Sequence, residues 1–381
     1  MPSVKQNNIL SFVILLFATS CQATELLTIQ YSDGETTKGK LHLPEATTVN
    51  TLVIFIHGTG PNTYENPREV AGKKFKYYDM FGEEFARRGI AFFSYNRRGC
   101  EIGTEPPNFD KVDREKFNKG VPTVEVADIG KIIAELRKHK SLNKAKVVLL
   151  GWSEGTMIAS MVAEVKENEV AGLLLAGYAH ENLFNTIKWQ YSGASSMLNL
   201  RPPFDANNDG KITQEEYESD GKKQTVWREK VMQGTKFETL DRNSDGSMTA
   251  EDFRITVEPA YKQILAKIEA NDADWIWDNY FRVSIGWLKE HFKLEPNKER
   301  LLRLEMPIYV FHGERDANVD VEGVRDLKKR FEKAGKKNLN AFVFEDHEHQ
   351  LNFFDWVLKG KRSKGCEAIF SAAEKLDRSF E

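Results

Sequence analysis

The sequence predicts an α/β protein with a mostly parallel, doubly wound sheet and one mainly helical insertion. Short apolar runs recur along the chain, segments with helical periodicity lie between them, and this alternation fails once, from about residue 181 to residue 304. Alternating strands and helices place successive strands side by side and parallel in one sheet. A chain of 381 residues can form one large domain of this kind together with an insertion.

The sheet is expected to start with a hairpin. Residues 25–44 alternate apolar and polar side chains around Asp33-Gly34, a dipeptide typical of a tight turn. Six apolar runs then predict buried strands, at residues 52–56, 90–95, 147–150, 170–176, 308–311 and 341–344. Four segments between them have helical periodicity, at residues 81–88, 124–139, 156–165 and 321–334.

The insertion is expected between the sixth strand of the sheet and the strand near residue 308. It contains five of the seven tryptophans, which are Trp189, Trp227, Trp275, Trp277 and Trp287. Its aromatic stretch at residues 275–292 could form the core of the insertion or line an acyl pocket. The predicted organisation is a signal peptide over residues 1–23, a first core segment over 24–180, an inserted helical cap over 181–304 and a second core segment over 305–381.

The N-terminus predicts export. Lys5 precedes an apolar run at residues 9–18, which has the length of a signal sequence and is too short to span a bilayer. Cleavage could fall after Ala23, or before Cys21 with lipid attached to that cysteine, and we prefer plain secretion. The protein is therefore expected to be secreted or periplasmic and to touch a membrane only through a lipid on Cys21. Cys100 and Cys366 could form one disulfide or remain two free thiols.

Charge excludes nucleic acid as an expected partner. The chain has 54 basic and 57 acidic residues and a formal net charge of −3, and no segment concentrates lysine and arginine.

A nucleophile is predicted at Ser153. Gly151-Trp152-Ser153-Glu154-Gly155 follows a predicted strand and precedes a predicted helix. A serine in the tight turn between such elements needs small neighbours, because the strand and the helix approach each other closely there.

Two backbone N–H groups are predicted to form an oxyanion hole. The loop His57-Gly58-Thr59-Gly60-Pro61 closes the strand at residues 52–56, and glycines there allow the backbone to approach a reacting carbonyl group. We choose the N–H of Thr59 as one donor and the N–H of Glu154 as the other. His57 is expected to orient the loop by hydrogen bonds.

The serine needs a base, and the base needs an acid to orient it. Asp316 lies just beyond the strand at residues 308–311, and His347 and His349 both follow the strand at residues 341–344. Folds that carry a nucleophilic serine in such a strand–turn–helix have their catalytic residues in the order Ser, Asp, His along the chain. We prefer His349 over His347 as the base because a helix begins directly behind it. The alternative acids are Glu314, Asp320 and Asp346.

These motifs resemble those of the α/β-hydrolase superfamily, closest to the bacterial esterases of the dienelactone-hydrolase and prolyl-oligopeptidase-like branch. The resemblance covers residues 26–178 and 306–356 and includes Tyr95-Asn96-Arg97-Arg98-Gly99. It implies that Ser153 attacks an acyl carbon, that His349 transfers the proton, that Asp316 holds the imidazole, and that water hydrolyses the acyl-enzyme.

The insertion departs from that pattern because it contains two loops of the EF-hand type. Oxygen donors stand at the positions that ligate calcium in such loops, and glycine stands at the sixth position. The expected ligands are Asp205, Asn207, Asp209, Lys211, Thr213 and Glu216 in the first loop, and Asp241, Asn243, Asp245, Ser247, Thr249 and Asp252 in the second, with Lys211 and Ser247 binding through their backbone carbonyl oxygens.

Calcium is expected in both loops, in a structural role rather than as a switch. Pro202-Pro203 is expected to spoil the helix that enters the first loop. Asp252 stands where a longer Glu would bind with both oxygens, so the second site is expected to be weaker.

Three functions are consistent with the sequence. The preferred one is an exported serine hydrolase that cleaves a small-molecule carboxylic ester or thioester. A serine peptidase of the prolyl-oligopeptidase type is less favoured, because such enzymes usually carry a long N-terminal propeller. A non-catalytic calcium-binding interaction protein on a hydrolase scaffold is the third, and the presence of nucleophile, acid and base argues against it.

Overall fold

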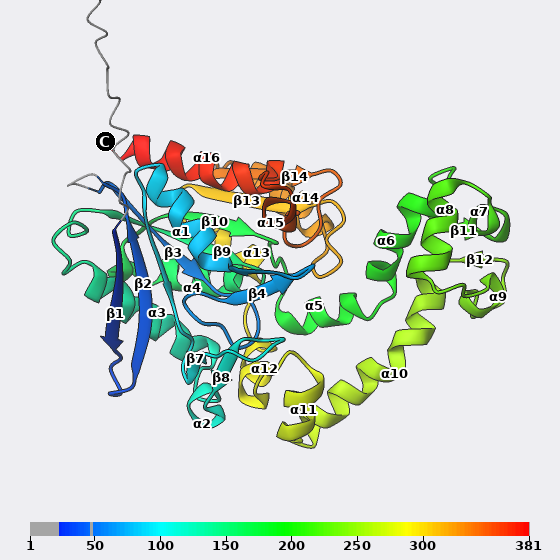
Figure 1. Ribbon diagram of the computed structural model, residues 1–381, viewed down its shortest axis with the longest axis horizontal. Helices are drawn as coiled ribbons and strands as arrows, with labels where there is room; N and C mark the ends of the chain where they lie inside the picture. Colours follow the sequence, from blue (N-terminus) through cyan, green and yellow to red (C-terminus); the bar gives the residue numbers. More distant parts are fainter. Residues whose placement is uncertain (1–22, 46–48, 381) are drawn as a thin grey trace, which may run out of the picture.

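The centre of the molecule is an eight-stranded sheet with strand order β1-β2-β6-β3-β9-β10-β13-β14 (Figure 1). The computed structural model describes residues 23–45 and 49–380. Every pair of neighbours from β6 to β14 is parallel, whereas β2 runs antiparallel to both β1 and β6. The predicted mostly parallel sheet is confirmed, and the predicted export segment, with Cys21, lies outside the described residues.

The sheet strands are β1 (Ala23–Gln30), β2 (Thr36–Leu43), β3 (Thr51–Ile56), β6 (Ala91–Tyr95), β9 (Lys146–Trp152), β10 (Val170–Ala176), β13 (Ile308–Gly313) and β14 (Leu339–Phe344). The first two form the predicted hairpin. Each of the six predicted apolar runs is a strand, and no end differs by more than two residues from its prediction.

Helices cover both faces of the sheet, which explains why its central strands are apolar along their whole length. Alternate residues of β3 enter two separate hydrophobic cores: Ile54 and Ile56 belong to one, and Val53 and Phe55 to the other. The first core includes side chains of α3 (Pro122–Leu136), α4 (Gly155–Glu164) and α14 (Glu322–Lys333), and the second includes side chains of α1 (Tyr77–Arg87) and α16 (Lys364–Ser379).

Short elements fill the connections of the core. They are the hairpin of β4 (Pro67–Val70) and β5 (Lys73–Lys76), the hairpin of β7 (Cys100–Ile102) and β8 (Asp110–Val112), α2 (Arg114–Phe117), the 3₁₀ turn η1 (Lys166–Asn168) and α15 (Phe354–Lys359). The sequence did not predict the two hairpins, because strands of three or four residues are too short to establish a periodicity.

The chain between β10 and β13 is mainly helical. Its elements are α5 (Leu183–Gln190), α6 (Ala194–Phe204), β11 (Ile212–Thr213), α7 (Gln214–Glu218), α8 (Lys222–Val226), the π-helical turn η2 (Trp227–Val231), α9 (Phe237–Leu240), β12 (Ser247–Met248), α10 (Ala250–Glu269), α11 (Ala273–Asn279), α12 (Ile285–His291) and α13 (Asn297–Leu301). In Figure 1, α6 to α9 and the adjoining part of α10 project away from the sheet, and we call residues 194–260 the arm. Among the described residues, no helix is long and apolar enough to cross a membrane.

Two hydrophobic clusters organise this region. One belongs to the arm alone, and it includes Phe204, Ile212, Tyr217, Phe237 and Met248. The other joins the base of the insertion to the core, because Met157 of α4 packs with Ile276, Trp287 and Leu288. The aromatic stretch at residues 275–292 thus contributes its buried members to the hydrophobic core of the insertion.

Two local expectations are settled by the structure. The prediction that Pro202-Pro203 spoils the entering helix is wrong: α6 runs through both prolines to Phe204. The two prolines lack N–H groups, but the N–H of Asp205 still donates to the carbonyl oxygen of Arg201, so the last turn of α6 remains closed. Cys100 and Cys366 are both free and buried, so they do not form a disulfide.

Candidate active site

Ser153 lies in a strained turn between β9 and α4. Its φ of 57° is in the left-handed region, which a residue with a side chain rarely adopts. Both flanking glycines are required by space. A Cβ on Gly151 would lie 2.4 Å from the carbonyl oxygen of Gly155, and a Cβ on Gly155 would lie 2.3 Å from that of Ile56. The strand, turn and helix that the sequence predicted around Ser153 are therefore present.

Hydrogen bonds attach this turn to the end of β10. The N–H of Ser153 donates to the carbonyl oxygen of Ala176 over 2.9 Å. The hydroxyl of Thr156 donates to the carbonyl oxygen of Ser153 over 2.7 Å and accepts from the N–H of Ala179 over 3.0 Å. The position of Ser153 is thus fixed relative to two neighbouring strands.

Asp316 and His349 form a hydrogen-bonded pair beyond β13 and β14. Nδ1 of His349 lies 2.7 Å from Oδ2 of Asp316, whose side chain is fully buried. Oδ1 of Asp316 accepts from the N–H groups of Asn318 and Val319, at 2.8 and 2.9 Å. With one oxygen held by the backbone, the other can orient the imidazole ring so that Nε2 remains available.

The imidazole of His349 lies beside the nucleophile turn. The indole N–H of Trp152 donates to the carbonyl oxygen of His349 over 3.2 Å. A Cβ on Gly177, the residue after the one that binds the N–H of Ser153, would lie 2.8 Å from Cε1 of His349. The base candidate and the nucleophile candidate therefore share one end of the sheet.

His347, the alternative base, has other partners. Its Nδ1 lies 2.8 Å from the carbonyl oxygen of Glu345, and its Nε2 accepts from the N–H of Gly365 over 3.3 Å. These contacts connect the turn after β14 to α16. The geometry therefore pairs Asp316 with His349, and it places His347 in a structural connection.

The pair shifts both of its pKa values. Burial alone would lower the pKa of His349, but the negative charge and hydrogen bond of Asp316 outweigh burial and raise it above the ordinary value. Burial alone would raise the pKa of Asp316, but the facing His349 lowers it below the usual range. The imidazolium form is thus stabilised beside a carboxylate that stays ionised.

The loop after β3 lies against Ser153 and is held rigidly. A Cβ on Gly58 would lie 3.4 Å from Cβ of Ser153. The side-chain amide of Asn62 donates to the carbonyl oxygens of Gly58 and Gly60, at 3.0 and 2.9 Å. Within the described residues, no hydrogen-bond acceptor meets the backbone N–H of Thr59 or that of Glu154. Both N–H groups are therefore free to receive an acceptor from a ligand.

His57 orients this loop, as the sequence suggested. It is fully buried, with Nδ1 2.8 Å from the Tyr78 hydroxyl and Nε2 2.8 Å from the carbonyl oxygen of Tyr95. Burial, together with the charge of Arg97, lowers the pKa of His57 to about 3. A ring that stays neutral can donate steadily to the carbonyl oxygen of Tyr95.

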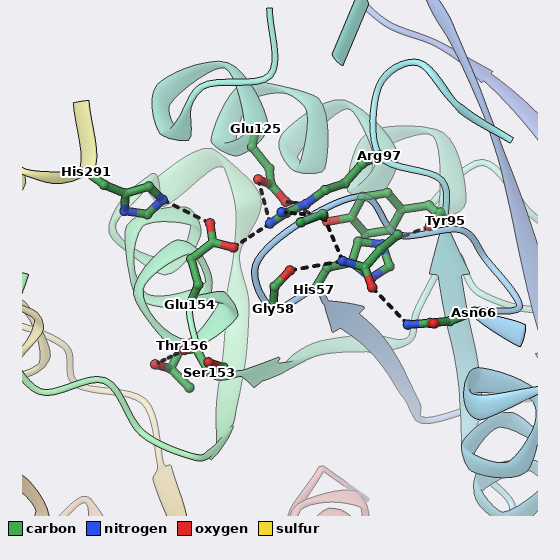
Figure 2. A network of polar contacts seen from close by, with 12 residues as sticks. His57, Gly58, Asn66, Tyr95, Arg97, Glu125, Ser153, Glu154, Thr156 and His291 are labelled. Atoms are coloured by element: carbon green, nitrogen blue, oxygen red, sulfur yellow. Dashed lines mark hydrogen bonds and ion pairs between the residues drawn. The ribbon is translucent and has the colours of Figure 1, made fainter. Parts of the chain in front are cut away.

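A buried charge network lies behind the turn and the loop (Figure 2). The guanidinium of Arg97 binds Glu154 at 2.7 Å, Glu125 at 3.1 Å and the carbonyl oxygen of Gly60 at 3.1 Å. The other oxygen of Glu154 lies 3.0 Å from Nε2 of His291, on α12 of the insertion. Burial alone would raise the pKa of Glu154, but Arg97 and His291 lower it to about 2, whereas burial raises the pKa of Glu125 to about 7.

A cavity of about 430 Å³ lies between α5 and the start of α14. Val319, whose N–H binds Asp316, lines it, and so do Trp189 and His180. His180 is hydrogen-bonded to Asp326 over 2.9 Å. Neither Ser153 nor His349 lines this cavity, so it neighbours the acid loop and lies apart from the nucleophile turn.

The two EF-hand-type loops have the same internal geometry. In each, the backbone N–H groups of the fifth and sixth residues donate to the carboxylate of the first, which is Asp205 or Asp241, over 2.9 to 3.1 Å. β11 and β12 pair the loops, with Ile212 opposite Met248. Within residues 23–45 and 49–380, however, no three His, Cys, Asp or Glu side chains gather as a metal site. The loops have the winding of calcium loops without a preassembled cage of carboxylates.

The fold and this site define a member of a large hydrolase-fold family. A family model described as the alpha/beta hydrolase fold matches residues 51–355, and the chain belongs to that family.

Solved structures share the same fold. A thermostable carboxyl esterase from Bacillus coagulans is 16% identical with a TM-score of 0.52, and the match covers 93% of this chain and 99% of the esterase. DcsB, solved with a substrate analogue, is 13% identical with a TM-score of 0.53, covering 94% and 100%. A lipase in an open form is 14% identical with a TM-score of 0.50, covering 94% and 99%. A comparison with curated protein sequences finds no match.

The sequence did not single out the residues that support the site. Arg97 belongs to the Tyr95–Gly99 motif, for which the sequence predicted no role, and no sequence pattern indicated a role for Glu125 or His291. The one signal available for Arg97 was its position two residues after the end of a buried strand. His291 gave no signal, since its partner Glu154 lies 137 positions away in the chain.

Replacing Asp316 by Asn is expected to lower the pKa of His349. The wild-type pKa lies above the ordinary value of about 6.5 because of the carboxylate, and without that charge only the opposing effect of burial remains. NMR titration of the His349 ring measures both values, with the ring of His139 as an internal control. Equal midpoints for His349 in the two proteins would contradict the assignment.

Proposed function

We propose that this protein is a serine hydrolase that cleaves a carboxylic ester or thioester through an acyl-enzyme. The main support is the arrangement of Ser153, Asp316 and His349. The serine is held at a φ of 57° beyond β9, and the 2.7 Å pair of Asp316 and His349 is attached to the same turn through Trp152. These are the parts that nucleophilic acyl transfer requires.

The proposed reaction uses the chain's own groups at each step. Nε2 of His349 takes the proton of the Ser153 hydroxyl as its oxygen attacks the acyl carbon. The N–H groups of Thr59 and Glu154 donate to the negative oxygen of the tetrahedral intermediate. His349 then gives the proton to the departing alcohol or thiol. Water, deprotonated by His349, attacks the acyl carbon, the bond between that carbon and the Ser153 oxygen breaks, and the Ser153 oxygen takes the proton from His349 as the carboxylic acid leaves.

A peptidase of the prolyl-oligopeptidase type would use the same residues, and so it differs from an esterase only in its substrate. If the protein were a non-catalytic interaction protein, the strained turn at Ser153 and the neighbouring Asp316–His349 pair would have no function. Because the strained turn costs about 1 to 3 kcal/mol, its presence supports a catalytic reading.

We also propose that both EF-hand-type loops bind Ca²⁺ and that the ion stabilises the arm. Glycines at φ of 88° and 87°, Gly210 and Gly246, give the two loops the same sharp turn. Thr213 with Glu216, and Thr249 with Asp252, form capping boxes at the helices that leave the loops. Both oxygens of Glu216 and of Asp252 accept from backbone N–H groups of their own loops, so the last carboxylate of each loop lies within the loop.

Export is proposed from Lys5 and the apolar run at residues 9–18, which lie outside the described residues. Plain secretion remains the preferred form, and lipid on Cys21 the alternative.

The first experiment is hydrolysis of p-nitrophenyl esters by the mature protein. Ser153→Ala and His349→Asn are expected to lose about 10³-fold or more in kcat, whereas His347→Asn retains activity. A fluorophosphonate probe should label the wild type and not Ser153→Ala. Hydrolysis of peptides alone would favour the peptidase, and a folded protein that neither reacts with esters nor takes the label would exclude a serine hydrolase.

Calorimetric titration with Ca²⁺ tests the arm. Two binding events are expected, and Asp205→Asn and Asp241→Asn should each remove one. The matched control is Asp220→Asn, an exposed residue between the loops that should keep both events. Calcium is also expected to raise the midpoint of thermal unfolding, because a ligand that binds only the folded state stabilises it. Absence of binding to the wild type would refute the calcium proposal.

Mass spectrometry of the protein produced in an exporting host tests the export proposal. The mass is expected to correspond to a chain that starts after Ala23. A chain that begins with a lipid-modified Cys21 would establish the alternative, and an uncleaved chain would refute both.

A further inference from the structure

We propose that the buried ion pair of Arg97 and Glu154, supported by His291 of the insertion, positions the two N–H groups of the oxyanion hole. Arg97, His291 and the side chain of Glu154 are positioning residues in this proposal, because all three side chains are buried and act on the donors through the turn and the loop. The inference rests on the proposed function and adds to it a role for the insertion in the chemistry at Ser153.

Arg97 connects the two segments that carry the proposed donors. One terminal nitrogen of its guanidinium donates to the carbonyl oxygen of Gly60, next to Thr59, and the other donates to Oε2 of Glu154. The backbone N–H of Arg97 donates to the carbonyl oxygen of Asn62 over 3.0 Å. A planar guanidinium fixes the direction of each bond, so the loop and the turn are held at a set separation.

Asn62 fixes the orientation of the N–H group of Thr59. Its amide donates to the carbonyl oxygen of Gly58, and this carbonyl belongs to the same peptide unit as the N–H of Thr59. In a trans peptide the two groups point in opposite directions. Holding the carbonyl of Gly58 therefore also fixes the direction of the N–H of Thr59.

The insertion also stabilises the Glu154 carboxylate, through its second oxygen. Oε1 of Glu154 accepts from His291, and the side chains of Glu154 and His291 are 1% and 0% exposed. The ring of Trp287 packs edge-on against His291 at a centroid distance of 4.3 Å. Because α12 supplies a buried partner to the residue next to Ser153, this part of the insertion is a fixed support of the turn. Figure 2 shows His291 and Arg97 on opposite sides of the Glu154 carboxylate.

A positioning role predicts a specific kinetic pattern. Loss of one oxyanion donor costs about 10²- to 10³-fold in kcat, and a donor displaced by about 1 Å loses part of that. Substrate binding depends less on these N–H groups than the transition state does, so kcat should change more than KM.

The test compares Glu154→Gln with Asp128→Asn in the full mature protein. Glu154→Gln keeps the backbone N–H but offers a single acceptor oxygen to Arg97 and His291. Asp128→Asn breaks a similarly buried pair, with the neighbouring Arg98 at 2.5 and 2.7 Å, which touches neither the turn nor the loop after β3. It therefore controls for the loss of a buried ion pair as such.

Two measurements are made on each protein: p-nitrophenyl ester kinetics and inhibition by an alkyl trifluoromethyl ketone. The ketone carbon forms a bond to the Ser153 oxygen, the serine proton moves to His349, and the carbonyl oxygen becomes the anion that the two N–H groups stabilise. Glu154→Gln is expected to lower kcat about 10- to 100-fold with KM within about threefold, and to weaken the ketone in proportion. Asp128→Asn should leave kcat and ketone inhibition within about twofold.

A second pair of variants keeps the test decisive if Glu154→Gln fails to fold. His291→Leu removes the bond to Oε1 and should show the same pattern more weakly, and His291→Gln, which retains a donor, should recover part of the loss. An unchanged kcat in both Glu154→Gln and His291→Leu would overturn the proposal. So would a loss in kcat without weaker ketone inhibition, or an equal loss in Asp128→Asn. An inactive and unlabelled wild type would overturn the proposed function instead.

Discussion

The site depends on the close approach of the first turn of α4 to the end of β3. Gly155 lies where any Cβ would be 2.3 Å from the carbonyl oxygen of Ile56 and 2.5 Å from that of His57. This contact places the positive end of the α4 dipole, the strained Ser153 and the glycine-rich loop at one point. The parallel order of β3, β9, β10, β13 and β14 then brings their carboxyl ends to the same edge, so that loops far apart in sequence meet there.

The buried charges around Arg97 need a reason other than stability. Removing a carboxylate and a guanidinium from water costs several kcal/mol per ion, and the pair regains this only with good geometry. Here one guanidinium serves Glu125 and Glu154, and burial raises the pKa of Glu125 to about 7 while Glu154 stays ionised. As pH rises from the ordinary pKa of a glutamate toward 7, ionisation of Glu125 in the folded protein becomes unfavourable and the free energy of unfolding falls. Glu154 acts in the opposite sense: it contributes stability at neutral pH, and this contribution is lost as pH falls from the ordinary pKa toward 2. Apolar side chains in place of these charged ones would pack there without the desolvation penalty, but they could not hold two loops at fixed orientations.

The predictable features were those that depend on local sequence. Strands such as β10 could be predicted directly from an apolar run. The Ser153 turn could be located because its glycines, the preceding strand and the following helix are adjacent in the chain. The choice between His347 and His349 needed the structure, since it depends on which ring reaches Asp316 across two strand ends. The bond between Glu154 and His291 depends on how the insertion packs, and no local pattern encodes that. The prediction for Pro202-Pro203 was wrong because a composition rule for proline does not show how the surrounding turn is closed, and here the N–H of Asp205 closes it on Arg201.

The insertion combines two mechanically different parts. The arm has its own hydrophobic cluster around Phe204 and Met248 and contains both EF-hand-type loops. The base packs on α4 through Met157 and reaches the nucleophile turn through His291. The chain enters the arm from α5 and leaves it along α10, which continues into the cluster that contains Trp287. An ion in the arm can therefore stabilise α10 without contacting the reacting groups. The insertion is connected to the reacting groups through the packing that holds His291 against Glu154, and through α5, where the side chain of Gln190 donates to the carbonyl oxygen of Asn318 in the acid loop.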